Sequence, residues 1–167
     1  ARQASLRCLS EGAGVRYDRH SATGGEWVPQ GGIVVRPTAS AEVKAMVSKG
    51  FRNPTMRELY LYPPSNEDLR PERMMNYELS WRHRLLGGLL GYGINLFYIK
   101  ADNIIQTINR KNVNTGKVEN SGIEADATFA IDSRWSVTTN HSYLHQARPV
   151  VSAPTYKGYI GGSFHSN

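Results

Sequence analysis

The chain has 167 residues, a formal net charge of +6, a single cysteine and a mean hydropathy of −0.47. One cysteine excludes an internal disulfide and a cysteine-based zinc site, and the negative hydropathy excludes a bundle of membrane-spanning helices. Lys and Arg residues are scattered along the chain without a basic cluster, so the positive charge does not predict nucleic-acid binding.

Apolar and polar residues alternate with a period of two in segment after segment, which is typical of β-strands. In chain order we predict eight strands, at residues 6–18, 27–37, 42–51, 73–85, 89–101, 119–131, 134–146 and 155–165. Most contain about ten residues or more, the length that a tilted strand needs to cross a bilayer. Strands of soluble proteins are usually nearer five or six residues. The pattern therefore favours an all-β, antiparallel, up-and-down transmembrane barrel.

The strand at residues 119–131 shows the alternation most clearly. Ile123 and Phe129 fall on one face, and Glu124 and Asp126 fall on the other. One face is therefore apolar and the other is wet, as in the wall of a membrane barrel.

The predicted connections alternate between short and long. Short turns are expected around residues 37–41, 86–88 and 132–133, and longer polar loops at residues 20–26, 52–72, 102–120 and 146–154. In a meander this alternation places every short turn at one end and every long loop at the other, as in outer-membrane barrels. Aromatic residues near predicted strand ends are consistent with interfacial girdles; they are Tyr17, Trp27, Tyr98, Trp135 and Tyr143.

Four ordered motifs carry a family resemblance. They are SKGFRNPTMRELY at residues 48–60, NEDLRPE at 66–72, NYEL at 76–79 and NTGKVENSGIE at 114–124. Together they resemble the barrel of TonB-dependent outer-membrane receptors, although Asn66 is not followed by the usual proline. The resemblance implies that residues 1–167 are part of a larger barrel of about 22 strands, with the family's plug domain not present in this stretch.

The same resemblance implies a function. Such receptors bind a scarce, bulky nutrient (a siderophore, haem, cobalamin or a glycan) and import it with energy from TonB and its partners ExbB and ExbD, which act through the plug. It also implies contact with outer-membrane lipid, a location in the outer membrane of a Gram-negative bacterium, and neither enzymatic activity nor a cofactor.

Nine residues are candidate contacts for the ligand or the plug. Five lie in or beside the long connection at residues 52–72, and four lie on the polar faces of predicted strands. They are Arg52, Arg57, Glu58, Tyr60, Tyr62, Glu78, Arg82, Glu124 and Asp126.

Other interpretations remain open at this point. The chain could form a complete small barrel of eight strands, or a soluble β-sandwich that serves as a binding module. Glu124 and Asp126 could do acid–base chemistry, but a solvated wall explains them better. His141 and His145 would lie about 13 Å apart in a strand, too far for one metal ion. His141 and Thr139 fall on the face expected to be apolar, which the pattern does not explain.

Overall fold

The computed structural model of the chain describes residues 8–147 and 154–166. Its strands are β1 (Cys8–His20), β2 (Gly24–Thr38), β3 (Ala41–Arg52), β4 (Glu72–Leu85), β5 (Leu90–Ile108), β6 (Lys111–Ala130), β7 (Trp135–Gln146) and β8 (Tyr156–Phe164). A one-turn helix, α1 (Met56–Leu59), follows β3, and a 3-10 turn, η1 (Leu86–Gly88), follows β4.

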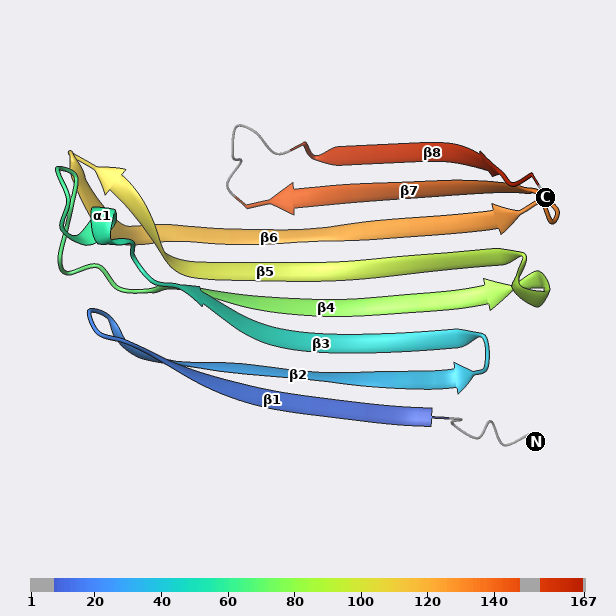
Figure 1. The fold of residues 1–167 in the computed structure, drawn as a ribbon, viewed down its shortest axis with the longest axis horizontal. Coiled ribbons are helices and arrows are strands. Elements are labelled where there is room, and N and C mark those ends of the chain that lie inside the picture. Colours follow the sequence, from blue (N-terminus) through green and yellow to red (C-terminus); the bar gives the residue numbers. More distant parts are fainter. Residues whose placement is uncertain (1–7, 148–153, 167) are drawn as a thin grey trace.

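The strands form one antiparallel sheet in which each strand pairs with the next in sequence (Figure 1). The predicted all-β, up-and-down architecture is therefore confirmed. A single layer contradicts the sandwich alternative, which requires two packed sheets. Among the described residues β1 and β8 pair only with β2 and β7, so the sheet is open at both edges. None of the helices in the described residues is long and apolar enough to span a membrane.

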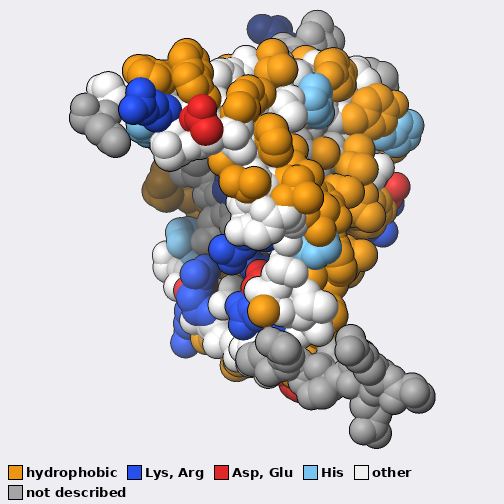
Figure 2. All heavy atoms as spheres, turned by 90° about the vertical axis from the view of Figure 1, so that its right-hand side faces the viewer, with side chains coloured by type: hydrophobic (Ala, Val, Ile, Leu, Met, Phe, Trp, Pro, Cys, Tyr) orange, Lys and Arg blue, Asp and Glu red, His pale blue; other side chains and the backbone are white. Residues whose placement is uncertain are grey.

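The strand register separates two chemically different faces. Ile123 lies opposite Leu96, which lies opposite Leu79, so apolar residues continue across three strands. On the other face Glu124 lies opposite Asn95. The end-on view in Figure 2 shows hydrophobic side chains along the outer side of the curved sheet and Lys and Arg side chains in its hollow. We call these the outward and inward faces.

The outward face is not covered by any other part of the described chain. Its large apolar side chains are exposed on every strand, from Leu9 in β1 to Phe164 in β8. Buried hydrophobic residues of the described chain are few: Ala41, Leu59, Leu69 and Ala101. Because an apolar face of this extent is unfavourable in water, the sheet requires an apolar surrounding.

Aromatic side chains on the outward face gather near both ends of the sheet. Tyr17 and Trp27 lie 4.8 Å apart between ring centroids, near the turn that joins β1 to β2. Trp135 and Phe164 lie 4.7 Å apart at the opposite end. This arrangement is consistent with the predicted girdles. Tyr98, in contrast, lies well inside β5, which continues beyond it.

A chain of hydrogen bonds explains the polar residues on the outward face of β7. The Thr139 hydroxyl donates to the Tyr159 carbonyl at 2.8 Å, so it accepts a bond from Nε2 of His141 at 2.9 Å. Nδ1 of His141 then accepts from the Tyr156 hydroxyl at 2.7 Å. One arrangement of protons satisfies all of these groups with a neutral imidazole. A fully bonded histidine is tolerated where an unpaired one would be costly.

The three predicted short turns lie at one end of the sheet, where η1 and the links from β2 to β3 and from β6 to β7 are found. The predicted loops at residues 20–26 and 102–120 are wrong. The first is a turn of only residues 21–23. The second is a continuation of β5 and β6, which pair as far as Ile108 and Lys111 around a two-residue turn.

The physical reason lies in the surroundings of these strand ends. Where both faces of a strand meet water, the alternation of apolar and polar residues is no longer required. Gly24 and Gly25 remain in the ladder although their composition favours a loop. At the end of β5, Asn109 and Arg110 have positive φ values of 50° and 61°, as in the tight turns that suit hairpins.

Two predicted long connections remain. Residues 52–72 form the longest connection in the described chain, and they are folded rather than extended. Of the predicted loop at residues 146–154, residues 148–153 lie outside the described part.

Candidate functional site

The nine candidate residues form two groups, one at the outer end of the sheet and one that runs from its middle toward the short turns. Arg52, at the end of β3, lies ten residues beyond Glu42 on the same strand, a rise of about 33 Å. The first group belongs to residues 52–72 and 103–114, which we call the outer module. The second lies on the inward face and continues toward the short turns.

Arg52 joins three parts of the outer module. Its guanidinium group binds the Glu58 carboxylate of α1 at 3.0 and 3.2 Å and the Glu72 carboxylate of β4 at 2.7 Å. The Glu72 carboxylate also accepts the backbone N–H of Ile105 in β5 at 2.9 Å. One arginine therefore holds the end of β3, the helix and the start of β4 together.

Glu58 also closes the start of α1. Its carboxylate accepts the backbone N–H of Thr55 at 2.7 Å, and the Thr55 hydroxyl accepts the N–H of Glu58 at 3.3 Å, which is a capping box. The Arg52 guanidinium, assisted by Thr55, holds the pKa of Glu58 below its ordinary value. Arg52 is therefore shared by the carboxylates of Glu58 and Glu72, and these ion pairs help to hold the shape of the module.

Asparagine side chains fasten the two parts of the module, residues 52–72 and residues 103–114, to each other. Nδ2 of Asn66 donates to the Asn112 carbonyl at 2.7 Å, and the Asn112 N–H donates to the Pro64 carbonyl at 2.7 Å. Asn114 exchanges two bonds with the backbone of Arg70, at 2.7 and 2.9 Å. Backbone groups of the connection are thus satisfied by a neighbouring hairpin, which fixes the shape of the connection.

Two leucines form a small core under the connection. The side chain of Leu59 is 1% exposed and that of Leu69 is 5% exposed. Above this core the chain turns outward: Tyr60 is 45% exposed and Tyr62 is 81% exposed. Arg57 is also exposed. The module therefore presents aromatic rings and a cation from a fixed base, which suits binding of a flat, conjugated or anionic ligand at low entropic cost.

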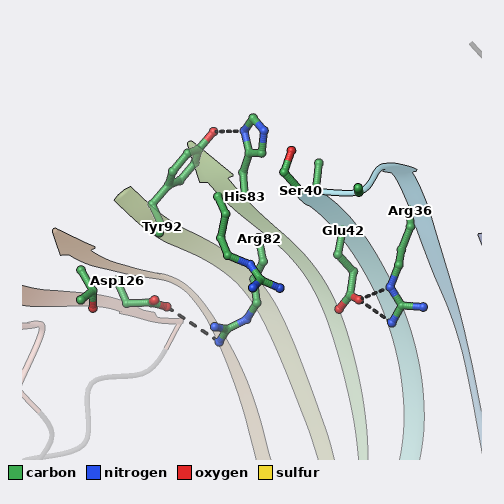
Figure 3. Close-up of a pocket in the computed structure, with 12 residues that line it drawn as sticks. Arg36, Ser40, Glu42, Arg82, His83, Tyr92 and Asp126 are labelled. Atoms are coloured by element: carbon green, nitrogen blue, oxygen red, sulfur yellow. Dashed lines mark hydrogen bonds and ion pairs between the residues drawn. The ribbon is translucent and has the colours of Figure 1, made fainter. Parts of the chain in front are cut away.

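Two members of the second group, Arg82 and Asp126, line the inward face near the short turns (Figure 3). Arg82 of β4 points toward Asp126 of β6 at 3.9 Å, and Arg36 of β2 pairs with Glu42 of β3 at 2.7 Å. These four residues alternate in charge along a hollow of about 400 Å³. Exposed ion pairs contribute little to stability, about 0–1 kcal/mol each. The row is therefore better suited to contacting a molecule in the hollow of the sheet than to stabilising the sheet itself.

Glu124 and Glu78 lie on the same inward face but not beside that ion pair. Glu124 accepts a hydrogen bond from Nδ2 of Asn95 at 3.4 Å, and Glu78 accepts one from Nδ2 of Asn76. Glu78 is about 13 Å along β4 from Arg82. The structure therefore brings together Arg52 with Glu58, and Arg82 with Asp126. Among the described residues no three His, Cys, Asp or Glu side chains converge as a metal site.

Several residues that matter to this architecture were not predicted. Asn66 and Asn114 lie within the motifs that carried the resemblance, and those motifs were the signal that could have identified them. Asn112 and Glu26 carry no such signal. Glu26 is 6% exposed and binds Lys49 at 2.9 Å and Arg73 at 2.8 Å, residues that lie far from it in sequence.

The profile of the family described as "TonB dependent receptor-like, beta-barrel" matches residues 12–166. The chain belongs to this family. Receptors of the family are transport proteins of Gram-negative outer membranes rather than enzymes. The motif at residues 66–72 is bonded, through the backbone of Arg70, to Asn114, the first residue of the motif at residues 114–124.

Individual relatives share the fold and part of the sequence. The ferric-pyoverdine 358 receptor of Pseudomonas putida is 27% identical over 129 residues, which is 69% of this chain and 14% of the relative. The siderophore receptor PirA of Pseudomonas aeruginosa is 27% identical with a TM-score of 0.76, covering 86% of this chain and 30% of that one.

A third similarity shows the fold alone. The ferric enterobactin receptor PfeA of Pseudomonas aeruginosa, in a mutant form bound to enterobactin, has a TM-score of 0.82 at 16% identity over 97% of this chain and 29% of that one. The chain thus spans less than a third of the length of each of these relatives.

Proposed function

We propose that this chain is part of an outer-membrane receptor that binds a ferric siderophore and imports it with energy from TonB. The observation that carries the proposal is the similarity to PirA, a siderophore receptor, at 27% identity over 86% of the chain. The curated relative is likewise named a ferric-pyoverdine receptor. These names favour a ferric siderophore over haem, cobalamin or a glycan. TonB acts together with ExbB and ExbD through the plug.

In this proposal the two faces of the sheet have different neighbours. The outward face meets outer-membrane lipid, because its apolar residues are otherwise uncovered. Residues 1–167 form part of the barrel wall, and a plug domain occupies the lumen. The inward residues Glu78, Arg82, Glu124 and Asp126 then face the plug or the passing ligand, where a wall of alternating charge offers partners of both signs.

The outer module is the proposed point of ligand capture. Arg57, Tyr60 and Tyr62 are exposed and contact the ferric chelate, while Arg52 and Glu58 position them through the ion pairs described above. A conjugated, anionic chelate would stack on the tyrosine rings and pair with the arginine.

The test is binding of purified complete receptor, in detergent or bilayers, to ferric pyoverdine and ferric enterobactin, with haem and cobalamin as comparison ligands. We expect one of the ferric siderophores to bind and the comparison ligands not to bind. Replacing both Tyr60 and Tyr62 by Ala should raise the dissociation constant about tenfold, which corresponds to about 1.4 kcal/mol.

Tyr143→Ala is the matched control, because Tyr143 is as exposed as Tyr60, at 47%, but lies on the outward face. It should leave the affinity unchanged. A folded receptor that binds haem or cobalamin and neither siderophore would refute the proposed ligand class. An unchanged affinity in the double variant would remove the outer module from the ligand site.

A further inference from the structure

A seam opens between β2 and β3 toward the outer end of the sheet. Their regular pairing ends at Gln30 and Ser48, whereas β3 continues to pair with β4 as far as Arg52 and Glu72. Pro29 stands directly beyond Gln30 and has no backbone N–H to donate. The ladder between β2 and β3 therefore stops where a donor is missing. Beyond this point, among the described residues, β1 and β2 pair only with each other.

The part of the hairpin beyond the seam, residues 15–29, is here called the outer ribbon. Its own ladder is intact, from the pair Val15 and Pro29 to the pair His20 and Gly24. Figure 1 shows this end of β1 and β2 twisting away from β3. Because its two strands stay paired with each other, the ribbon is able to move as one body.

A buried carboxylate crosses the seam. Glu26 in the ribbon is 6% exposed and binds Lys49 of β3 at 2.9 Å and Arg73 of β4 at 2.8 Å. The Thr23 hydroxyl adds a bond to Oδ1 of Asn53 at 3.0 Å. The side chains of Lys49 and Arg73 are 20% and 50% exposed, so Glu26 is the buried member of the cluster. Burying its carboxylate costs desolvation that the two cations roughly offset, so the net stabilisation of the closed position is small. An ion-pair contact with so small a net stabilisation can form and break, which would let the ribbon close against β3 and open again.

Both strands of the hairpin carry glycines next to the seam, on the side of the short turns, and we call these glycines the belt. Gly12 lies opposite Gly32, and Gly31 lies opposite Ala13. A Cβ at Gly12 would have no atom within 4 Å, so packing within this chain does not require glycine at that position. The belt borders a hollow of about 430 Å³. Glycines opposite one another make a strand pair easier to bend, as a hinge needs.

We propose that the outer ribbon is a hinged flap, held against β3 and β4 by Glu26 and bending at the glycine belt of Gly12, Gly14, Gly31 and Gly32. When Glu26 releases Lys49 and Arg73, the ribbon swings away from the sheet. The movement opens the seam beyond Ser48 and widens the outer mouth of the barrel. It does not depend on which ligand the receptor binds.

The test is a distance measurement by pulsed electron paramagnetic resonance on the complete receptor in bilayers. Spin labels are placed at Ala22→Cys in the ribbon and Glu67→Cys in the outer module, with Cys8→Ser removing the native thiol. Both labelled positions are exposed. The parent should show one narrow distance. Glu26→Gln should add a longer distance and raise the ratio of open to closed receptor about tenfold.

The matched control is Asp18→Asn, which removes the ion pair with Arg16 at 2.7 Å inside the ribbon without touching the seam. It should leave the distance distribution unchanged. Lys49→Gln, which keeps the bond from Arg73 to Glu26, should open the flap less than Glu26→Gln and serves if that variant does not fold. The proposal is overturned if neither seam variant changes the distribution, or if Asp18→Asn changes it equally.

Discussion

The outer module and the outer ribbon lie at the same end of the sheet (Figure 1), but they are attached differently. The module is fixed by the Arg52 ion pairs, by three asparagines and by the buried side chains of Leu59 and Leu69. The ribbon is attached across its seam by the Glu26 carboxylate and the Thr23 hydroxyl. Regular strand structure therefore does not by itself indicate rigidity, because the irregular connection is the better anchored of the two.

The test with the largest expected effect removes the small core of the module. Leu59→Ala should lower the local stability of residues 56–66 by about 2–5 kcal/mol, since Leu59 is 1% exposed and its loss leaves a cavity. Hydrogen exchange of the complete receptor, followed by mass spectrometry, measures this as faster exchange in that segment. Leu61→Ala, at a 51% exposed neighbour, is the control and should have little effect. Equal effects from the two would show that the module has no core.

The next test removes a bond between the two parts of the outer module. Asn112 is 6% exposed, and its side chain bonds the Glu58 carbonyl at 3.4 Å and the Thr107 hydroxyl at 2.8 Å. Asn112→Ala should cost about 1–3 kcal/mol of local stability, because buried polar partners lose their bonds. Exchange should rise in both residues 56–66 and the end of β5. The exposed Lys111→Ala is the control, and a rise confined to one segment would contradict the proposed docking.

A third test uses pH. Because the pKa of Glu58 is held below its ordinary value of 4.5, its ion pair stabilises the module fully above that value and is lost as the pH falls through the lower, folded-state pKa. Protection of residues 56–66, corrected for intrinsic exchange rates, should be constant near neutral pH and fall in acid below about pH 4.5. Glu58→Gln should be less protected at neutral pH and should lose part of this dependence. An identical acid response in both proteins would exclude Glu58 as a contributor.

The test with the smallest expected effect stiffens the base of the ribbon. Gly12→Ala should stabilise the receptor by about 0.4–1 kcal/mol, since the added Cβ meets no atom and the unfolded chain loses freedom. Gly32→Ala is the contrast, because its Cβ would lie 3.0 Å from the Ala45 carbonyl oxygen, and it should destabilise. Thermal unfolding of the receptor, followed by its migration on gels without boiling, measures both. Destabilisation by Gly12→Ala would mean that an unseen neighbour occupies that space.

The sheet was predictable because its central part has one apolar and one polar face. Ile123 and Glu124 alternate there since lipid and water require it, and the strand order and the short turns follow from that pattern. The extensions of β1, β2, β5 and β6 were not predictable, because strands with water on both sides carry no such period. The Asn109–Arg110 turn was missed for the same reason.

The candidate site was predicted in part. Arg52, Glu58 and the two tyrosines were identified as candidates because they lie in or beside the predicted connection at residues 52–72, but the sequence did not reveal that the two charged residues pair with each other. The bonds of Asn112 and Glu26 join residues far apart in sequence, and one sequence contains no record of such contacts. For the inward residues, the alternation gave the face correctly, while the proximity of Arg82 to Asp126 depends on the register between strands.

The docking of residues 52–72 on residues 103–114 has an immunological consequence. The exposed surface around Tyr60 and Tyr62 takes its shape from bonds to the hairpin of β5 and β6, through Asn112 and Asn114. An antibody that recognises this surface therefore binds a discontinuous epitope. A linear peptide of residues 52–72 would elicit sera against other shapes, whereas an immunogen that includes the hairpin would present the surface in its folded shape.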